Sequence, residues 1–336
     1  MTISIGSWKH TRCTFGTTVV SAIAALGMCL IAVGPSSAQS YPSRLIKFIV
    51  PLTPGSPIDV MARLTAHHLA SRLGQNVIVE NRPGGGGMTG TKAVATAAPD
   101  GYTLLFAGVN HTLSPAVFKG LNYDPVKDFA PIATVGTGSW VLVVVPSVPA
   151  RSVHELVAYA KANPGRLNWG FGVNTGPQLL GEMFKTASGI NVANISYKGG
   201  AQVVPDMLGG RIQMNIATTA TLLPLIRQGE LRALAVTSEA RSPDLPDVPT
   251  MIESGFPRLT LGLWGGLLAP AGTPAGIIRK LNAEINASVT SSEMDASMVK
   301  LGFAPKVGSP QDFAALIVNE IEAWGRAAKS AGINPE

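Results

Sequence analysis

The stretch FIVPLTPGSPIDVMARLTAHHLASRL, residues 48–73, sets the fold class of this chain. It opens with a short apolar, β-branched run at residues 48–50, which predicts a buried strand. The proline-rich residues 51–57 fit neither a helix interior nor a central strand, so they predict a loop. Ser56 can cap the helix that follows, and Asp59 completes a capping box. Strand, loop and helix in this order are typical of an α/β domain.

The loop and the helix start together form a geometry that collects anions. Unpaired backbone N–H groups and the positive end of a helix dipole point toward whatever occupies such a loop. Thr53, Gly55 and Ser56 can each donate a backbone N–H here, whereas Pro54 and Pro57 cannot. The alternative interpretation is an ordinary turn of an α/β domain without a ligand. A second unit of the same kind, further along the chain, favours binding.

That second unit is a strand, a glycine-rich loop and a helix within residues 167–188. Its loop reads Phe171-Gly172-Val173-Asn174-Thr175-Gly176, and Thr175 with Gln178 predicts another capping box. Ligands of open α/β sheets gather outside the carboxyl ends of the strands. Two such loops, one in each lobe, would therefore face one cleft. Each loop favours a negative group, so a molecule with two separated carboxylates fits best.

The first 38 residues predict a cleaved signal peptide. Lys9 and Arg12 form a basic start, residues 15–33 are apolar and small, and Ser36-Ser37-Ala38 precedes the expected cut. An uncleaved membrane anchor is the alternative, but hydroxyl residues dilute the apolar run and a cleavage site follows it directly. We therefore expect an exported protein that begins near residue 39.

Composition excludes several classes of function. Both cysteines, Cys13 and Cys29, fall in the leader, so the exported chain has no disulfide and no thiolate nucleophile or metal ligand. Removing the two basic leader residues lowers the net charge from +6 to +4, and the charges are scattered, which argues against a nucleic-acid partner. The four remaining histidines lack metal-ligand spacing, and the chain has no hydrolase elbow motif, so neither a metal site nor catalysis is expected.

Strands and helices alternate along the chain, which predicts mostly parallel sheets flanked by helices. Two long apolar runs, 140–145 and 261–268, are each long enough to cross between domains. We therefore predict a hinged, two-lobed α/β protein with a discontinuous first lobe, residues 39–142 and 264–336, around a second lobe at residues 143–263. After the second crossing only helices are expected.

Residues 85–90, GGGMTG, match the GxGxxG pattern of dinucleotide-binding loops. A dinucleotide site also needs an acidic residue at the end of the next strand. Asp100 precedes that strand, and Gly108-Val109-Asn110 follows it. We therefore expect no dinucleotide and no other cofactor. Asn110, at the end of that strand, becomes a candidate ligand contact.

Lys198 follows the strand predicted at residues 194–197 and is flanked by Gly199 and Gly200. It can pair a ligand carboxylate at the carboxyl edge of the sheet. The alternative is a solvated loop lysine.

Taken together, these motifs resemble the solute receptors of tripartite tricarboxylate transporters, also called Bug receptors. The resemblance rests on YPSR at 41–44, the loop at 50–59, VENRPG at 79–84, APDGYTL at 98–104, YDP at 123–125, KDFAP at 127–131, YKG at 197–199, LRALAVT at 231–237, LPDVPT at 245–250 and LAPAGTP at 268–274. It implies a two-lobed periplasmic binding protein of type II-like fold that captures a small organic acid without catalysis. It also implies membrane permease subunits as partners, and we expect a monomer. The alternatives are a sensory receptor that signals to a partner, or an enzyme on the same fold.

The resemblance also implies which residues hold the ligand. Family members use the two loops largely through backbone and water. The sequence departs from the residues that are usual in the family at three places: at Pro54 and Pro57, at Phe171 with Gln178, and at Ala217. These departures weaken the case for citrate-like and amino-acid ligands. They favour a smaller or more apolar acid, including an aromatic one. The candidate ligand-binding residues are Leu52, Thr53, Pro54, Gly55, Ser56, Asp59, Asn110, Phe171, Gly172, Val173, Asn174, Thr175, Lys198, Ala217 and Thr218.

Overall fold

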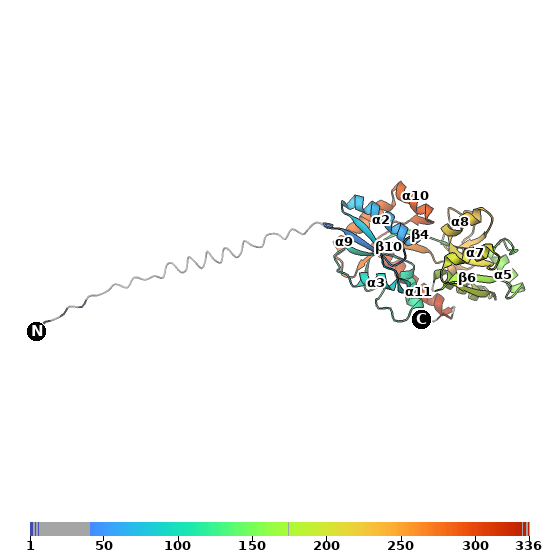
Figure 1. The fold of residues 1–336 in the computed structure, drawn as a ribbon, viewed down its shortest axis with the longest axis horizontal. Coiled ribbons are helices and arrows are strands. Elements are labelled where there is room, and N and C mark those ends of the chain that lie inside the picture. Colours follow the sequence, from blue (N-terminus) through green and yellow to red (C-terminus); the bar gives the residue numbers. More distant parts are fainter. Residues whose placement is uncertain are drawn as a thin grey trace. The chain divides into compact units, whose positions relative to one another are not determined.

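The computed structural model describes residues 1, 2, 4, 6, 41–173, 175–330, 332, 333 and 335. Residues 44–336 form one compact unit, and everything below concerns that unit (Figure 1). Most of the expected signal peptide, and its cleavage site, lie outside the described residues. Among the described residues, no helix combines the length and the apolar character needed to cross a bilayer.

The strands form two separate sheets. The first sheet has the order β11-β4-β10-β3-β1-β2, and the second has the order β7-β6-β8-β5-β9. The first contains β1 (Ile46–Val50), β2 (Val77–Asn81), β3 (Thr103–Gly108), β4 (Phe129–Gly138), β10 (Leu263–Pro270) and β11 (Phe303–Pro305). The second contains β5 (Trp140–Val144), β6 (Asn168–Gly172), β7 (Ala193–Tyr197), β8 (Met214–Thr218) and β9 (Arg232–Val236).

Both sheets are mixed, so the expectation of mostly parallel pairing is too simple. Strand β1 pairs in parallel with β2 and β3, and β6 pairs in parallel with β7 and β8. Strand β10 is antiparallel to β3 and β4, and β5 is antiparallel to β8 and β9. Strands β5 and β10 each follow a passage from one sheet to the other, and the edge strand β11 is also antiparallel to its neighbour β4. A strand that follows such a passage enters from the opposite end and needs no crossover helix.

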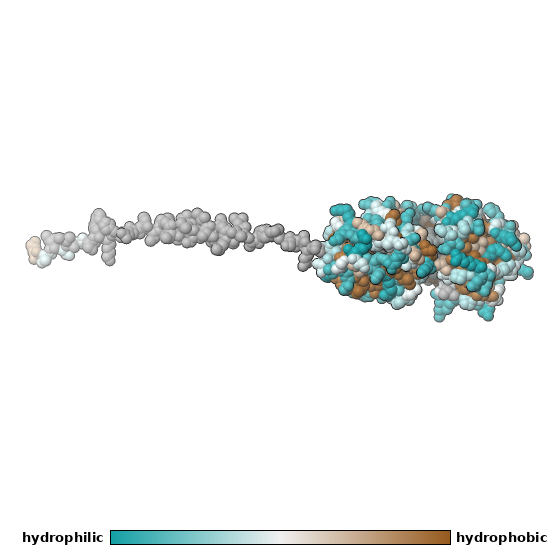
Figure 2. All heavy atoms as spheres, turned by 90° about the horizontal axis from the view of Figure 1, so that it is seen from above, coloured by the Kyte–Doolittle hydropathy of each residue, from teal (hydrophilic) through white to brown (hydrophobic). Residues whose placement is uncertain are grey.

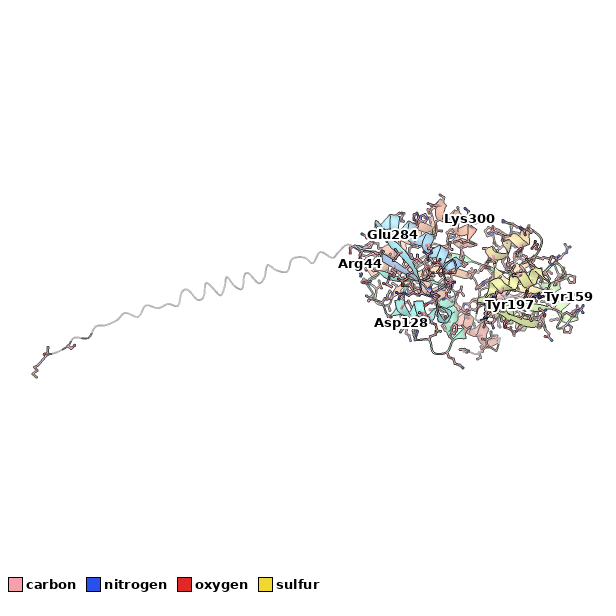
Figure 3. The ribbon with its side chains drawn as sticks, in the orientation of Figure 1. Arg44, Asp128, Tyr159, Tyr197, Glu284 and Lys300 are labelled. Carbon is pink, nitrogen blue, oxygen red and sulfur yellow. The ribbon has the colours of Figure 1, made fainter. Side chains whose placement is uncertain are left out.

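Helices flank both sheets (Figure 1). With the first sheet lie α2 (Pro57–Leu73), α3 (Met88–Ala95), α4 (Asn110–Val117), α9 (Ala275–Val289) and α10 (Ser292–Lys300), and with the second lie α5 (Val153–Ala162), α6 (Gly176–Ser188), α7 (Val203–Leu208) and α8 (Thr219–Arg227). Short 3₁₀ turns are η1 (Gly85–Gly87), η2 (Gly200–Gln202) and η3 (Pro257–Leu259). Figure 3 shows the same division, with Arg44 and Glu284 beside the first sheet and Tyr159 and Tyr197 beside the second.

The chain crosses between the sheets at Ser139, which joins β4 to β5. The Ser139 hydroxyl lies 2.9 Å from the hydroxyl of Thr219, and the Ser139 carbonyl accepts hydrogen bonds from the Thr219 backbone N–H and hydroxyl. The return passage lies between β9 and β10. The last helix, α11 (Pro310–Ser330), packs against α4 and against α6, so it contacts elements attached to both sheets. The lobe boundaries themselves stay a prediction.

Only helices were expected after the second crossing, and this is wrong for β11. Residues 303–305 form a three-residue edge strand against β4. A strand this short carries too little alternation to be recognised from its own sequence.

The surface of residues 44–336 is mixed. Figure 2 shows apolar residues in small groups between hydrophilic ones on the face that it displays. The large apolar side chains are instead concentrated inside, where Trp169, Trp264 and Trp324 are all fully buried. Scattered exposed apolar residues are normal for a folded protein in water.

Candidate functional site

A cavity of about 430 Å³ opens where loops of the two sheets meet. The first sheet contributes Pro51, Leu52, Thr53, Pro83, Gly84, Gly86, Gly87, Val109, Asn110, Leu113 and Leu263, and the second contributes Trp140, Thr175, Gly176 and Pro177. The loops that follow β1, β3 and β6 all reach it. These are carboxyl ends of strands, where α/β sheets place their ligands. Four predicted residues, Leu52, Thr53, Asn110 and Thr175, are among the lining.

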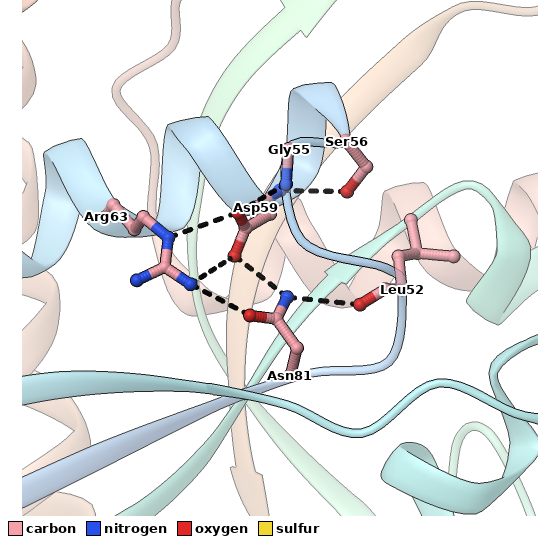
Figure 4. Close-up of polar contacts among 6 residues, drawn as sticks. All are labelled: Leu52, Gly55, Ser56, Asp59, Arg63 and Asn81. Atoms are coloured by element: carbon pink, nitrogen blue, oxygen red, sulfur yellow. Dashed lines mark hydrogen bonds and ion pairs between the residues drawn. The ribbon is translucent and has the colours of Figure 1, made fainter.

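The loop before α2 is closed upon itself by Asp59 (Figure 4). The Asp59 carboxylate accepts a hydrogen bond of 2.8 Å from the Gly55 N–H, and a second of 2.8 Å from the side-chain amide of Asn81. Arg63 donates to the same carboxylate through Nε at 3.1 Å. The Asn81 amide also donates to the Leu52 carbonyl. One buried carboxylate therefore ties the loop, the helix and strand β2 together.

Opposing effects act on the pKa of Asp59. Burial by itself raises the pKa of the carboxyl group, but hydrogen bonds from Arg63, Gly55 and Asn81 outweigh burial and hold the pKa below its ordinary value of 3.8. The carboxylate is therefore ionised at neutral pH. It balances the charge of Arg63 within the loop.

This arrangement changes what the loop can offer an anion. The Gly55 N–H is bound to Asp59, and the Ser56 N–H is bound to the Thr53 carbonyl. The predicted capping by Ser56 is confirmed, because its hydroxyl oxygen accepts from the Asp59 N–H at 3.2 Å. Pro54, Gly55, Ser56 and Asp59 are not among the cavity lining. They shape the loop that presents Leu52 and Thr53, and their direct contact with a ligand stays a prediction.

The start of helix α6 is open toward the cavity. The expected capping bond from Thr175 is wrong, because its hydroxyl donates to the Gly172 carbonyl at 2.7 Å instead of accepting from the helix. The Gly176 N–H, in the first turn, makes no hydrogen bond within the described residues. Thr175, Gly176 and Pro177 line the cavity. A helix of 13 residues thus directs its positive end, with an available donor, at the cavity.

Sequence reasoning missed the glycine turn that forms another wall. Gly84, Gly85, Gly86 and Gly87 all have positive φ angles, between 54° and 133°. Residues with side chains rarely adopt such backbone angles. The turn therefore explains the four consecutive glycines, and a dinucleotide-binding role is not needed to explain them. A Cβ on Gly87 would lie 2.5 Å from the amide nitrogen of Asn110, so that side chain packs directly over the turn. The GxGxxG pattern was the available signal.

Replacing Gly87 with alanine should weaken ligand binding about tenfold or more. The new methyl group would displace the Asn110 amide from the cavity wall, and the φ of +102° adds about 1–2 kcal/mol of strain. Calorimetric titration measures the affinity. Gly165→Ala is the matched control, because Gly165 also has a positive φ, of 73°, but open space around it. Equal affinities for the two variants would remove the glycine turn from the site.

The remaining predicted residues lie outside the lining. Phe171 is 5% exposed within β6, and a Cβ on Gly172 would lie 3.0 Å from the Gly200 nitrogen, so both belong to the packed end of that strand. Val173 is 45% exposed. The others are Lys198, which is exposed, Ala217 and Thr218 at the end of β8, and Asn174, which lies outside the described residues. Their role as ligand contacts stays a prediction.

Behind the cavity wall lies a buried carboxyl group on α11. Glu320 Oε2 is 2.7 Å from the Thr112 hydroxyl and 2.7 Å from the indole Nε1 of Trp264. Burial raises the pKa of Glu320 to about 7, against the hydrogen bonds that lower it. Thr112 belongs to α4 and Trp264 to β10, and both elements line the cavity. Glu320 therefore braces two walls from behind.

Metal chemistry has no evident centre here. Within the part of the chain that the structure describes, no group of three His, Cys, Asp or Glu side chains is close enough to hold a metal ion. His111 follows Asn110 but turns away from the cavity, with Nε2 2.9 Å from the Pro125 carbonyl. Burial lowers the pKa of His111 to about 4. It is a neutral core histidine at pH 7.

Comparison with known proteins places this architecture in a family. Residues 61–333 match the tripartite tricarboxylate transporter family receptor. The chain belongs to that receptor family. BugT of Bordetella pertussis is 36% identical over 316 residues, which cover 92% of this chain and 97% of BugT. The family consists of binding proteins, so the chain is a solute receptor and not an enzyme.

Solved structures of similar sequence share the fold. Rpa4515 of R. palustris, solved with adipate, has a TM-score of 0.76 at 34% identity and covers 88% of this chain and 100% of its own. MatC from Rhodopseudomonas palustris, with bound malate, has a TM-score of 0.71 at 29% identity, with coverages of 86% and 100%. The fold is that of periplasmic binding proteins, as the sequence resemblance implied.

Proposed function

We propose that this receptor captures a small organic acid in the cavity between its two sheets. The observation that carries the proposal is the start of α6, which directs an unused N–H and the positive end of a 13-residue helix into the cavity. A carboxylate is the ligand group that such a site favours. Two relatives support the same chemistry, since one was solved with adipate and the other with malate.

The second carboxylate of a diacid would lie toward the glycine turn. There the Asn110 side-chain amide makes no hydrogen bond with any described residue, and it faces the ligand space over Gly87. This wall belongs to the first sheet, whereas α6 belongs to the second. A diacid would therefore bridge elements of both sheets, which favours a closed, liganded form over an open one.

Delivery to a membrane transporter completes the proposal. The family is defined by tripartite transporters, so the partners of this chain would be the membrane subunits of such a system. Relatives are periplasmic binding proteins, and residues 1–38 read as an export signal. We expect the periplasmic fraction of expressing cells to hold a chain that begins near Gln39, which N-terminal sequencing would test. A full-length, membrane-bound product would instead support the anchor.

A thermal-shift screen tests the proposed ligand class. The purified receptor is unfolded and refolded to remove any bound solute, and then mixed with mono-, di- and tricarboxylates, aromatic acids, amino acids and sugars. A ligand at a hundred times its dissociation constant adds ~2.7 kcal/mol of stability, which raises the melting temperature by roughly 5 °C. A response confined to acids supports the proposal. A response to sugars alone would refute it.

Lys198 needs a separate test, because it is exposed and lies outside the cavity lining. If its ammonium group pairs a ligand carboxylate on closure, Lys198→Met should weaken binding about tenfold, in line with a charge-assisted hydrogen bond of about 1.5 kcal/mol. Lys161→Met, on α5, is a control for loss of one positive charge. Unchanged affinity in Lys198→Met would make Lys198 an ordinary surface lysine.

A further inference from the structure

We infer that the cavity selects acids whose body is bare hydrocarbon and rejects acids of the same length that carry hydroxyl groups. This inference rests on the proposed function and adds to it the class of substrate. It concerns the part of the ligand between or beside its carboxylates, and it assigns the discrimination to Trp140, Leu113 and Leu263.

The walls of the cavity are apolar over most of their side chains. The apolar side chains that line it are Pro51, Leu52, Pro83, Val109, Leu113, Trp140, Pro177 and Leu263. Among the described residues that line it, none is ionisable. The polar side chains there are Thr53, Asn110 and Thr175. A ligand body in this space therefore meets carbon atoms far more often than hydrogen-bonding groups.

The few polar groups are placed where carboxylates would bind, and part of their capacity is already used. The Thr175 hydroxyl donates a hydrogen bond to the Gly172 carbonyl. Asn110 and Gly176 lie on elements of different sheets, and they leave the apolar residues for the ligand body. Hydroxyl groups along that body would lose their bonds to water and find few protein partners, of which the Thr53 hydroxyl is one.

Nearby polar groups cannot turn in to serve such hydroxyls. Asp59, Arg63 and Asn81 are bound to one another and to the loop before α2. Glu320 is bound to Thr112 and Trp264 behind the wall. These networks are satisfied without the ligand, so recruiting a member would leave a buried group unpaired.

Trp140 gives the apolar wall its rigidity. Its side chain is only 3% exposed, and Trp324 packs edge-on against it with ring centroids 6.1 Å apart. Gly176 lies so close that a Cβ there would be 3.0 Å from the Trp140 ring and 3.3 Å from the Trp324 ring. The indole is thus packed tightly against Gly176 and Trp324, which hold it in the apolar wall.

Matched pairs of acids test the inference by titration calorimetry on the refolded receptor. Adipate and galactarate share six carbons and two carboxylates, and galactarate adds four hydroxyl groups; succinate with malate and glutarate with 2-hydroxyglutarate are shorter pairs. In every pair that binds, the unhydroxylated member should bind more tightly, by about tenfold for one added hydroxyl and about 100-fold or more for four. Equal or tighter binding of the hydroxylated members overturns the inference and leaves the carboxylate function standing. No binding of any acid in the wider panel overturns both.

A variant assigns the discrimination to the wall. Leu263→Gln places an amide in the half-buried first position of β10, beside the cavity. It should weaken binding of the preferred acid about tenfold. It should also reduce the difference in affinity between that acid and its hydroxylated counterpart. Val299→Gln makes a comparable change on α10, at a side chain that is 49% exposed and outside the cavity, and should leave both affinities unchanged. If the difference in affinity between the two acids is as large in Leu263→Gln as in the parent, Leu263 does not determine specificity. A melting curve for each variant separates this result from loss of folding.

Discussion

Between pH 5 and pH 8 the stability of the Glu320→Gln variant relative to the parent protein should rise by about 2.5 kcal/mol. The pKa of buried Glu320 is about 7, against an ordinary value of 4.5, so ionising this group costs the folded state roughly 1.4 kcal/mol for each unit of the difference. Glutamine has nearly the same shape and never ionises, but no single atom of its amide can both donate to Thr112 and accept from Trp264. Glu320→Gln therefore loses part of this hydrogen bonding at every pH and avoids the cost of ionisation at high pH.

The hydrogen bonds around Glu320 support a neutral carboxyl group. The single hydroxyl proton of Thr112 has two acceptors within reach, the Val109 carbonyl at 3.0 Å and Glu320 Oε2 at 2.7 Å. If Oε2 carries a proton, it donates to Thr112, accepts from Trp264, and lets Thr112 donate to Val109. Each of the three contacts, Glu320–Thr112, Glu320–Trp264 and Thr112–Val109, then contains one proton. If Glu320 is ionised, the Thr112 hydroxyl can donate to only one of its two acceptors.

The pH dependence has a defined sign. Between pH 4.5 and 7 the folded state holds more protons on Glu320 than the unfolded state does, so this group makes stability fall as pH rises. His111 acts oppositely, since its folded pKa of about 4 lies below the ordinary 6.5, and stability falls as pH drops through that window. In the parent the opposite effects of Glu320 and His111 on stability largely offset each other between pH 4.5 and 6.5. In Glu320→Gln only the effect of His111 remains of the two, so stability should rise with pH across this range.

Denaturant unfolding at pH 5, 6, 7 and 8 measures these differences. The stability of Glu320→Gln relative to the parent should rise by about 2.5 kcal/mol from pH 5 to pH 8. Glu322→Gln is the control, because Glu322 lies on the same helix with its side chain 64% exposed. A difference between Glu320→Gln and the parent that does not change with pH would mean that the pKa of Glu320 is not raised in the folded protein.

Replacing Asp59 with alanine should destabilise the receptor by about 2–3 kcal/mol and reduce ligand binding at least tenfold. The Asp59 side chain is 3% exposed, and its loss leaves the Gly55 N–H, the Asn81 amide and the Arg63 guanidinium without their shared acceptor. Hydrogen bonds to a buried charge are worth about 1.5–3 kcal/mol. The loop that presents Leu52 and Thr53 would lose its fixed shape, and part of the cavity with it.

Two measurements separate these consequences for Asp59. The melting temperature should drop by roughly 5 °C, and calorimetry should show the weaker affinity below that temperature, where the variant is folded. Asp312→Ala is the matched control, because Asp312 also closes a helix start, on α11, but is exposed. It should change stability far less and leave binding intact. Normal affinity in folded Asp59→Ala would show that the loop keeps its shape without the carboxylate.

Local sequence signals predicted the elements well wherever the cause is local. The prolines at 51, 54 and 57 end a strand and open a helix by fixed backbone geometry, and Ser56 caps that helix as expected. The same reasoning failed at Thr175, whose hydroxyl found the nearer Gly172 carbonyl. The hydroxyl groups of Ser56 and Thr175 can each donate or accept a hydrogen bond. Which partner each hydroxyl binds depends on the backbone path of its loop, and a capping pattern in the sequence does not specify that path.

The sequence by itself determined the α/β class, the family resemblance and the two loops at strand ends, because these depend on periodicity, turn residues and motifs that are read locally. Tertiary structure alone decided which groups line the cavity. It turned Asp59 inward onto Arg63 and Asn81, brought the glycine turn against Asn110, and packed Trp140 against Gly176 and Trp324. The physical reason is that hydrogen-bond donors and apolar faces are assigned by competition among neighbours distant in the chain, and that competition is settled only when the two sheets pack.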